Sequence, residues 1–243
     1  METIKFLPME KRILAVGPAP HNRLFEREPV KVDTINPLSY REVLDKFLSG
    51  DYFIAISFNP RYILDGYGNE LYKRGIPHLI PTVEAFQLTK PAESKAFLIR
   101  NQIPTTKAEI FDNLDDIYDF LEYTDEYPII IRTEKGSKLV KNASQAAHVL
   151  KSLVDNNTVF PQIIVENISQ DQLVKEITFA FRNHIIGDER LVRAIRSDVG
   201  HFDGFVESIK EGDRIVYFRF IPSEEPLRDF LDNNWQKFLE AVL

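Results

Sequence analysis

The sequence predicts a two-part α/β protein, with a Rossmann-like first domain followed by a mixed α+β domain. Up to residue 81, short apolar runs alternate with amphipathic stretches, an order typical of a parallel sheet covered by helices. Later in the chain, three runs with partial period-two patterning favour an antiparallel sheet. We expect the boundary at 81–91, which gives domains 1–85 and 86–243, the second comprising a small subdomain at 92–160 and a partial sheet at 161–243.

In the first domain, apolar runs predict the strands and turn residues predict their ends. Helices are predicted at 39–48, with Ser39 as the N-terminal cap, and at 64–73, with Gly75 just beyond the C-terminus. The strands are predicted at 13–16, 30–35, 52–58 and 77–81.

In the second domain, helical and strand patterns are less regularly ordered. Pro226 lies in the first turn of the last predicted helix, where proline is tolerated. The predicted helices are 92–101, 114–123, 144–155 and 224–243. The predicted strands are 106–111, 129–133, 162–165, 177–183, 191–195 and 215–221.

Composition excludes several classes of function. The absence of cysteine excludes disulfides, thiolate metal sites and a cysteine nucleophile, and it gives weak support to a cytoplasmic location. The five histidines are dispersed, with no zinc-type pair. A net charge of -7 argues against binding a nucleic-acid backbone, and no signal peptide or membrane-spanning run is evident. We therefore expect neither nucleic acid nor membrane as a partner.

Four spaced segments carry the strongest functional signal. They are RGIPHLIPTVEAFQLTKPAESKAF at 74–97, NQIPTTKAEIFDNLDDIYDFLE at 101–122, YPIIIRT at 127–133 and QIIVENIS at 162–169. In this order they resemble the ATP-grasp superfamily, and most closely its phosphoribosylamine–glycine ligases, also called glycinamide ribonucleotide synthetases. Several pieces in the right order are far more specific than one short motif. The resemblance identifies a shortened, divergent ATP-grasp protein, with a pre-ATP-grasp domain first and an incomplete ATP-grasp domain after it.

The resemblance implies an ATP site with magnesium, in which cations contact the phosphates and a carboxylate contacts the ribose or adenine edge. It assigns the first phosphate contact to Lys95, and Arg132 stands where the family has a second lysine. Glu166 and Ile168 hold the hinge positions beside the nucleotide, and Glu176 matches a glutamate at the start of the next strand. From the residues alone, a structural ion pair for Arg132 and a surface position for either glutamate remain open alternatives.

The sequence also departs from the family. The phosphate-covering flap, glycine-rich in the family, is reduced here to residues 134–138, with Lys138 as a candidate replacement for backbone amides and a solvated turn as its alternative. No late strand carries the family's metal-binding acid and "E.N" pair, and no spacing argues for Asp203 or Glu207 as a metal ligand. By resemblance, the acceptor side of the site would include Arg193, Arg196 and Asp198; a charged strand edge is their alternative.

Two functions are consistent with these features. The first is an ATP-dependent carboxylate–amine ligase in purine biosynthesis, working through an acyl phosphate. The second is a catalytically inactive nucleotide-binding or scaffold protein on the same fold. A homo-oligomer or a partner chain could complete the site in either case.

Overall fold

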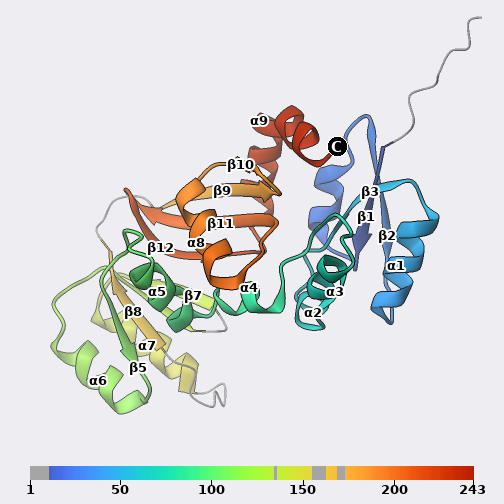
Figure 1. Cartoon of the computed structure of the whole chain (residues 1–243). Coiled ribbons are helices and arrows are strands. Elements are labelled where there is room, and N and C mark those ends of the chain that lie inside the picture. The colour runs from blue at the N-terminus through green and yellow to red at the C-terminus, as the bar shows by residue number, and fades with distance from the viewer. Residues whose placement is uncertain (1–10, 134–135, 155–162, 169–172) are drawn as a thin grey trace, which may run out of the picture. The chain divides into compact units, whose positions relative to one another are not determined.

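The computed structural model describes residues 11–133, 136–154, 163–168 and 173–243 (Figure 1). Within these residues the chain forms two compact units. Unit 1 comprises the chain up to Phe86 together with Ile177–Val206 and Phe220–Leu243, and unit 2 comprises Gln87–Glu176 and Glu207–Arg219. The predicted division at 1–85 and 86–243 stays a prediction. No helix among the described residues is both long enough and apolar enough to cross a membrane.

Unit 1 begins with a parallel sheet in the order β2-β1-β3-β4. Alternate residues of β1 pack into separate cores on its two faces, Ile13 and Ala15 on one and Leu14 and Val16 on the other. A strand buried on both faces explains the continuous apolar run in the sequence. The strands are β1 (Lys11–Val16), β2 (Val30–Ile35), β3 (Tyr52–Ile56) and β4 (His78–Leu79).

The helices of this first part are η1 (Pro20–Phe25), α1 (Tyr40–Ser49), α2 (Pro60–Leu64) and α3 (Tyr67–Lys73). The helix predicted at 64–73 is confirmed as α3, which begins at Tyr67, and a separate short helix, α2, precedes it. Gly66, between them, has a φ of 78°, a left-handed conformation that glycine adopts without steric penalty. The four predicted strands are confirmed.

A second sheet has the order β10-β9-β11-β12, with antiparallel pairing of β10 with β9 and of β11 with β12. Its elements are β9 (Val174–Phe181), β10 (His184–Ile186), β11 (Gly204–Glu211) and β12 (Arg214–Arg219). By the division above, β9 and β11 each have residues in both units. Two helices of unit 1 accompany these strands in sequence, α8 (Glu189–Val199) and α9 (Glu224–Val242).

The strand predicted at 191–195 is wrong, because this segment lies within α8. Leu191, Val192 and Ile195 are buried on one helical face, while Arg193 between them is exposed. The side chain of Asp188 caps the helix by accepting a hydrogen bond from the Leu191 backbone amide. The capping residue and the spacing of four between Leu191 and Ile195 are helical signals that the β-branched content of the segment obscured.

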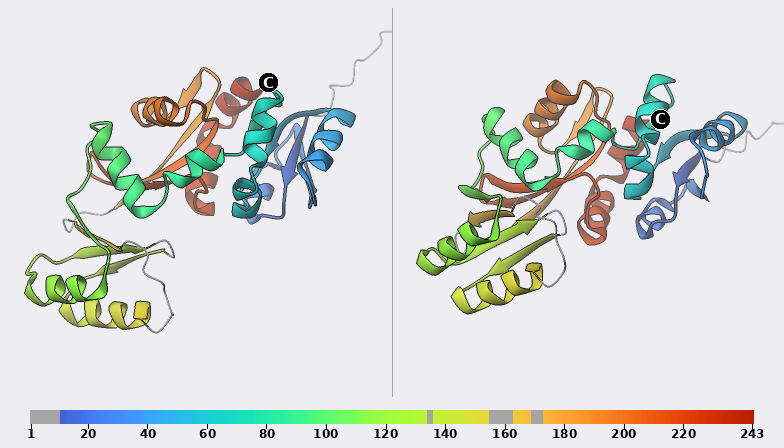
Figure 2. Two further views of the ribbon diagram at one scale, coloured as in Figure 1. Left: turned by 60° about the horizontal axis from the view of Figure 1, so that its bottom comes forward. Right: turned by 90° about the horizontal axis from the view of Figure 1, so that it is seen from below.

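Unit 2 contains a third sheet in the order β5-β8-β6-β7. Its strands are β5 (Ala108–Phe111), β6 (Ile129–Thr133), β7 (Gly136–Val140) and β8 (Ile163–Asn167). The accompanying helices are α5 (Pro91–Arg100), α6 (Leu114–Tyr123) and α7 (Ala143–Val154). Helix α4 (Val83–Gln87) precedes them and crosses the boundary between the two units. Helices α6 and α7 both cover one face of this sheet, which we call the helix face (Figure 2).

The opposite face of this sheet, here the hinge face, packs differently. Ile130 on β6 and Ile168 just after β8 join Ile209 and Val216 in a small apolar cluster. Period-two alternation therefore sends Ile131 and Val165 to the helix face and Ile130 to the hinge face. Strand β7 occupies part of the predicted flap. Residues 134–135 of that flap lie outside the described residues.

Candidate functional site

Lys95 lies in the second turn of α5, a helix that begins with a proline at its first position. Its side chain is only 1% exposed. The ammonium nitrogen is 2.7 Å from Thr105 Oγ1, 3.1 Å from Thr106 Oγ1 and 3.0 Å from Glu166 Oε2. Two backbone carbonyl oxygens, of Thr106 and Val216, complete its surroundings. Since an ammonium has three protons, these acceptors fully satisfy it.

Glu166 connects Lys95 to Arg132. Its carboxylate is completely buried, and Oε1 lies 2.8 Å from Arg132 Nη2 while Oε2 accepts from Lys95 and from the Thr106 hydroxyl at 2.6 Å. Antiparallel pairing of β6 with β8 places Glu166 opposite Ile130, two residues from Arg132, so the two charged side chains emerge from the same face. Two cations and one carboxylate thus form a buried group, which we call the ion-pair cluster.

The ion-pair cluster carries one excess positive charge. Burial lowers the pKa of Lys95, Glu166 opposes this change, and the neighbouring Arg132 adds to it. Burial also lowers the pKa of Arg132, again against the effect of Glu166. The Nε atom of Arg132 is buried and has no hydrogen-bond partner within the described residues. An unmet N–H donor beside excess positive charge is suited to an anion such as a phosphate oxygen.

An aromatic ring covers Arg132. The Cζ atom of the guanidinium lies 4.8 Å from the centre of the Tyr217 ring, a cation–π contact supplied by β12. The Tyr217 hydroxyl is 3.4 Å from Ser137 Oγ on β7. Beside these groups, Ile168 is 4% exposed in the apolar cluster of the hinge face. The arrangement therefore joins cations, an aromatic ring and apolar side chains, and it leaves the charged groups almost entirely buried.

Two other predicted site residues lie elsewhere in unit 2. Lys138 pairs with Ile131 in the β6–β7 ladder and so faces the helices, where its ammonium is 3.4 Å from Ser152 Oγ on α7. Glu176 on β9 is half exposed and forms an ion pair with Lys210 of β11. Neither contacts the ion-pair cluster, because strand alternation turns Lys138 to the other face and a cross-strand lysine holds Glu176.

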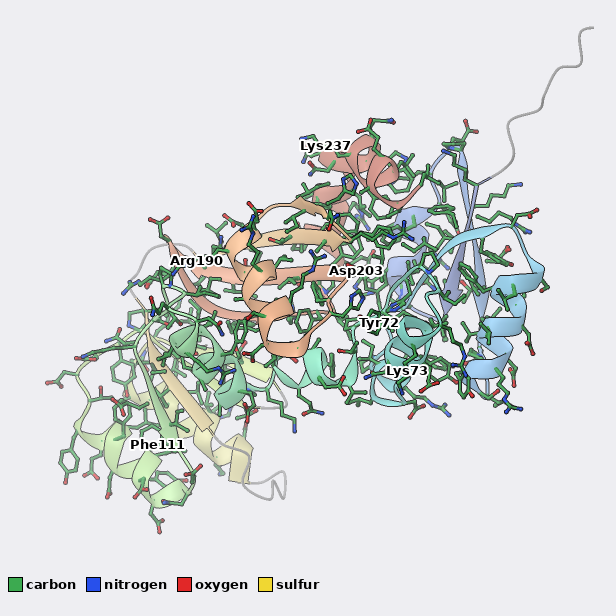
Figure 3. All side chains as sticks on the ribbon, viewed as in Figure 1. Tyr72, Lys73, Phe111, Arg190, Asp203 and Lys237 are labelled. Atoms are coloured by element: carbon green, nitrogen blue, oxygen red, sulfur yellow. The ribbon has the colours of Figure 1, made fainter. Side chains whose placement is uncertain are left out.

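The predicted acceptor residues belong to α8 in unit 1. Arg193 is exposed and pairs with Glu189 one turn earlier, and Asp198 is also exposed. Arg196 donates to the Phe202 carbonyl and lies 3.0 Å from Asp203, a residue labelled in Figure 3. The charged strand edge that was their alternative is wrong, because the segment is helical.

The residues present do not form a magnesium site on the late strands. Glu207 on β11 is fully buried, and both of its carboxylate oxygens accept from Arg219 on β12, at 2.8 and 3.1 Å. A bidentate guanidinium thus supplies the positive charge that a divalent cation would supply to this carboxylate. Asp203 is held by Arg196 and by the Arg182 backbone amide. Among the described residues, no group of three or more histidine and acidic side chains is arranged to hold a metal.

Sequence reasoning missed three residues whose side chains contact the ion-pair cluster. Thr105 and Thr106 follow Pro104 in a quoted segment, so two adjacent hydroxyls ten or eleven residues after Lys95 were an available signal. Thr105 also donates to the Ile215 carbonyl at 2.6 Å, which ties this loop to β12. Tyr217 gave no signal, because its contact with Arg132 depends on two strands far apart in the sequence.

A parallel four-stranded sheet, followed by a helix-covered antiparallel sheet and a second antiparallel sheet, is the ATP-grasp fold, and comparisons with solved structures agree. The chain is similar to phosphoribosylamine–glycine ligase from Thermotoga maritima, with a TM-score of 0.69 and 12% identity over 95% of this chain and 74% of that one. It is also similar to D-alanine–D-alanine ligase from Bacillus anthracis, with a TM-score of 0.59 and 12% identity over 96% of each chain.

A third similar structure is a RimK domain ATP-grasp protein from Sphaerobacter thermophilus, with a TM-score of 0.56 and 16% identity over 91% of this chain and 95% of that one. No protein-family model matches the chain. At these identities the likeness shows the fold alone. The predicted fold class and the predicted resemblance to a divergent ATP-grasp protein are confirmed at that level.

Proposed function

We propose that this protein binds an adenine nucleotide on the hinge face of unit 2 and does not catalyse magnesium-dependent ligation. The observation that carries the proposal is the ion pair of the buried Glu207 with Arg219, whose side chain is 39% exposed, because it neutralises a carboxylate on the late strands with a side chain of the protein itself. Acyl-phosphate formation from ATP needs a mobile metal to neutralise the developing charge. A salt-bridged guanidinium cannot enter and leave with the nucleotide.

The ion-pair cluster supports nucleotide binding. Lys95 and Arg132 come from separate elements yet meet at one carboxylate, and the Nε–H of Arg132 is unmet. A phosphate group can add a second anion beside Glu166, with a charge-assisted hydrogen bond from Arg132. Ile168 and the cluster around it would form an apolar wall for the base. Magnesium has no part in this proposal.

Entry of the nucleotide requires a local change. Lys95 is 1% exposed and Arg132 is 4% exposed at the side chain, and Tyr217 covers the guanidinium. In this proposal the Tyr217 ring moves off Arg132 and the phosphate replaces the aromatic contact. Binding free energy is reduced by the free energy of that opening, so we expect weaker binding than in a preformed site.

The test is calorimetric titration of the full chain with ATP, once with magnesium and once with EDTA. We expect the same Kd in both titrations, and no ADP release when phosphoribosylamine and glycine are added. Lys95→Ala is expected to abolish binding, while Lys107→Ala, which removes an exposed lysine from the helix face, is the matched control. Thermal melting verifies that both variants fold. Absence of ATP binding in the wild-type protein would overturn the proposal.

The ligase hypothesis is the second candidate, and the fold shared with phosphoribosylamine–glycine ligase and D-alanine–D-alanine ligase favours it. It predicts the opposite result in the same experiment, namely magnesium-dependent binding with ADP release in the presence of an amine and a carboxylate. A role of the protein in purine biosynthesis would follow only if phosphoribosylamine and glycine were its substrates. The expected cytoplasmic location stays a prediction under either candidate.

A further inference from the structure

The negative charge of this protein is concentrated in one segment. Residues 107–126 contain eight acidic side chains and one lysine, an excess of seven negative charges, equal to the net charge of -7 of the whole chain. The rest of the chain therefore has equal numbers of acidic and basic residues. A local excess of this size creates a one-sided electrostatic field over the elements that carry it, β5, α6 and the loop after α6.

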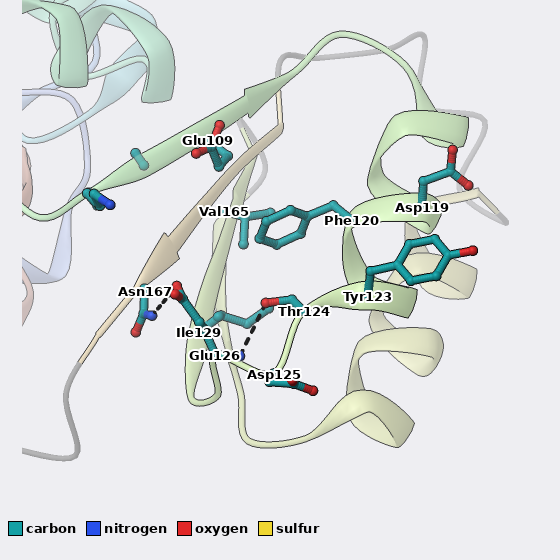
Figure 4. A pocket seen from close by; sticks show the side chains of 12 residues that line it. Glu109, Asp119, Phe120, Tyr123, Thr124, Asp125, Glu126, Ile129, Val165 and Asn167 are labelled. Carbon is teal, nitrogen blue, oxygen red and sulfur yellow. Dashed lines mark hydrogen bonds between the residues drawn. The ribbon is translucent and has the colours of Figure 1, made fainter.

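These elements border a cavity of about 710 Å³ on the helix face of unit 2 (Figure 4). Ile129 and Val165 supply an apolar floor, and Phe120 and Tyr123 of α6 supply aromatic walls. Four carboxylates also line it, and we call it the acidic pocket. The acidic members are Glu109, Asp119, Asp125 and Glu126.

Lys107 also lines the acidic pocket, so four carboxylates face one ammonium there, and within the described residues none of the four forms an ion pair. Glu126 accepts a hydrogen bond of 2.7 Å from the Asn167 amide, a neutral donor. The last turn of α6 contains no basic residue, and the C-terminal end of a helix adds partial negative charge. Carboxylates and the helix end therefore point to a cationic occupant.

An exposed aromatic ring extends the surface beyond the pocket. Tyr123 is 79% exposed, while Tyr118, about 140° around the same helix, does not line the pocket. Tyrosine is enriched at the centres of protein interfaces, and its ring accepts the guanidinium or the methylene stem of a basic side chain. Carboxylates without an ion-pair partner, beside an exposed tyrosine and an apolar floor, match arginine or lysine side chains, which have a charged end and an apolar stem.

We propose that the acidic pocket and the adjoining face of α6 dock a basic segment of a partner protein, with an arginine or lysine side chain seated between Tyr123 and the pocket carboxylates. Nucleic acids and anionic membranes are repelled by this charge. A second copy of the chain is a poor match, because the rest of the sequence has no net positive charge. The surface lies on the opposite face of the sheet from Lys95, Arg132 and Glu166, so the proposal is independent of nucleotide binding.

The experiment measures fluorescence anisotropy of a labelled ten-residue peptide of alternating arginine and glycine, titrated with the full chain at low salt. Asp119→Lys combined with Asp125→Lys is expected to weaken binding at least about tenfold. The matched control, Glu225→Lys combined with Asp229→Lys, makes the same change of net charge on the exposed side of α9 and is expected to stay within about twofold. Tyr123→Ser is expected to weaken binding about threefold through the lost ring contact.

Three outcomes would overturn the proposal. Equal weakening by both double variants would mean that only overall charge matters. Displacement of the peptide by spermine at equimolar concentration would assign the pocket to a free polyamine. A concentration-dependent dimer in light scattering that disappears in the Asp119/Asp125 double variant would assign the face to a second copy. Circular dichroism melting of each variant ensures that a loss of binding is not a loss of folding.

Discussion

The two faces of the unit 2 sheet hold charge in opposite ways. On the hinge face, Lys95, Arg132 and Glu166 are almost entirely buried and form ion pairs with one another. On the helix face, at the end near α6, carboxylates such as Asp119 and Asp125 are exposed without basic partners among the described residues. Adjacent residues of one strand, Val165 and Glu166, serve the two faces. The difference shows that strand alternation separates a buried group of ion-paired charges from exposed carboxylates on the opposite face.

The largest expected effect is a loss of unfolding free energy when the buried ion-pair cluster of the hinge face is broken. Glu166→Ala leaves two buried cations without their carboxylate and should destabilise the protein by about 3–5 kcal/mol. Glu126→Ala, which removes an exposed carboxylate from the helix face, should cost less than about 0.5 kcal/mol. Urea unfolding of the two variants measures both. Similar losses in the two variants would show that the ion-pair cluster contributes no more than surface charge.

The next effect concerns a buried titratable group without a charged partner, His78 in unit 1. Burial, with a smaller contribution from His201, lowers the pKa of His78 from 6.5 to about 4. Because the folded state disfavours the protonated ring, this stability is fully present above pH 6.5 and is lost as the pH falls towards 4. The expected loss is about 3 kcal/mol, from roughly 1.4 kcal/mol per pKa unit.

The measurement for His78 is the difference in unfolding free energy between wild type and His78→Gln across pH 4–7. Asp203 and His201 also titrate in the folded protein, with a raised and a lowered pKa caused mainly by burial. Because wild type and His78→Gln both contain Asp203 and His201, subtracting one unfolding free energy from the other removes most of the contribution of these two residues. A difference that does not change over this pH range would contradict the assignment.

A smaller effect, on ATP affinity, tests whether the Tyr217 ring blocks access to Arg132. Tyr217→Ala removes the ring that covers Arg132 and should tighten ATP binding by about three- to tenfold, the value of one cation–π contact. Tyr118→Ala, which removes an exposed ring from α6, is the control and should leave ATP affinity unchanged. Weaker binding by the Tyr217 variant would mean that the ring holds the nucleotide instead of excluding it.

The smallest expected effect is the change in unfolding free energy when exposed carboxylates of the helix face are neutralised. Asp119→Asn and Asp125→Asn remove solvated charges and should each change unfolding free energy by less than about 0.5 kcal/mol. Their sign should be slightly stabilising at low salt, because repulsion among the acids of 107–126 decreases. Thermal melting at low and high salt measures this. A loss above 1 kcal/mol would reveal a structural role for these carboxylates.

Features of the fold and of the site could be predicted from the sequence where they depend on residues close together in the chain. The four strands of the parallel sheet were predictable from apolar runs, and Lys95, Arg132 and Glu166 were singled out by ordered segments that the fold brings together. Helix α8 was mistaken for a strand because its β-branched residues masked a helical spacing. Lys138 was expected near the phosphates, yet the register of β6 with β7 turns it to the helix face.

The remaining features depend on long-range pairing. The contact of Tyr217 with Arg132 and the ion pair of Arg219 with Glu207 each arise from strand register, which single-sequence patterns do not specify. The charge excess of 107–126 was visible in the sequence, but only the structure gathers four of its carboxylates around a cavity with an apolar floor.

The most direct test of the central claim is calorimetric titration of the wild-type chain with ATP in the presence and absence of magnesium. The account predicts one binding event with the same Kd in both conditions, because Arg219 already neutralises Glu207 and the phosphates meet Lys95 and Arg132. Binding that requires magnesium and proceeds to ADP release with an amine and a carboxylate would contradict it.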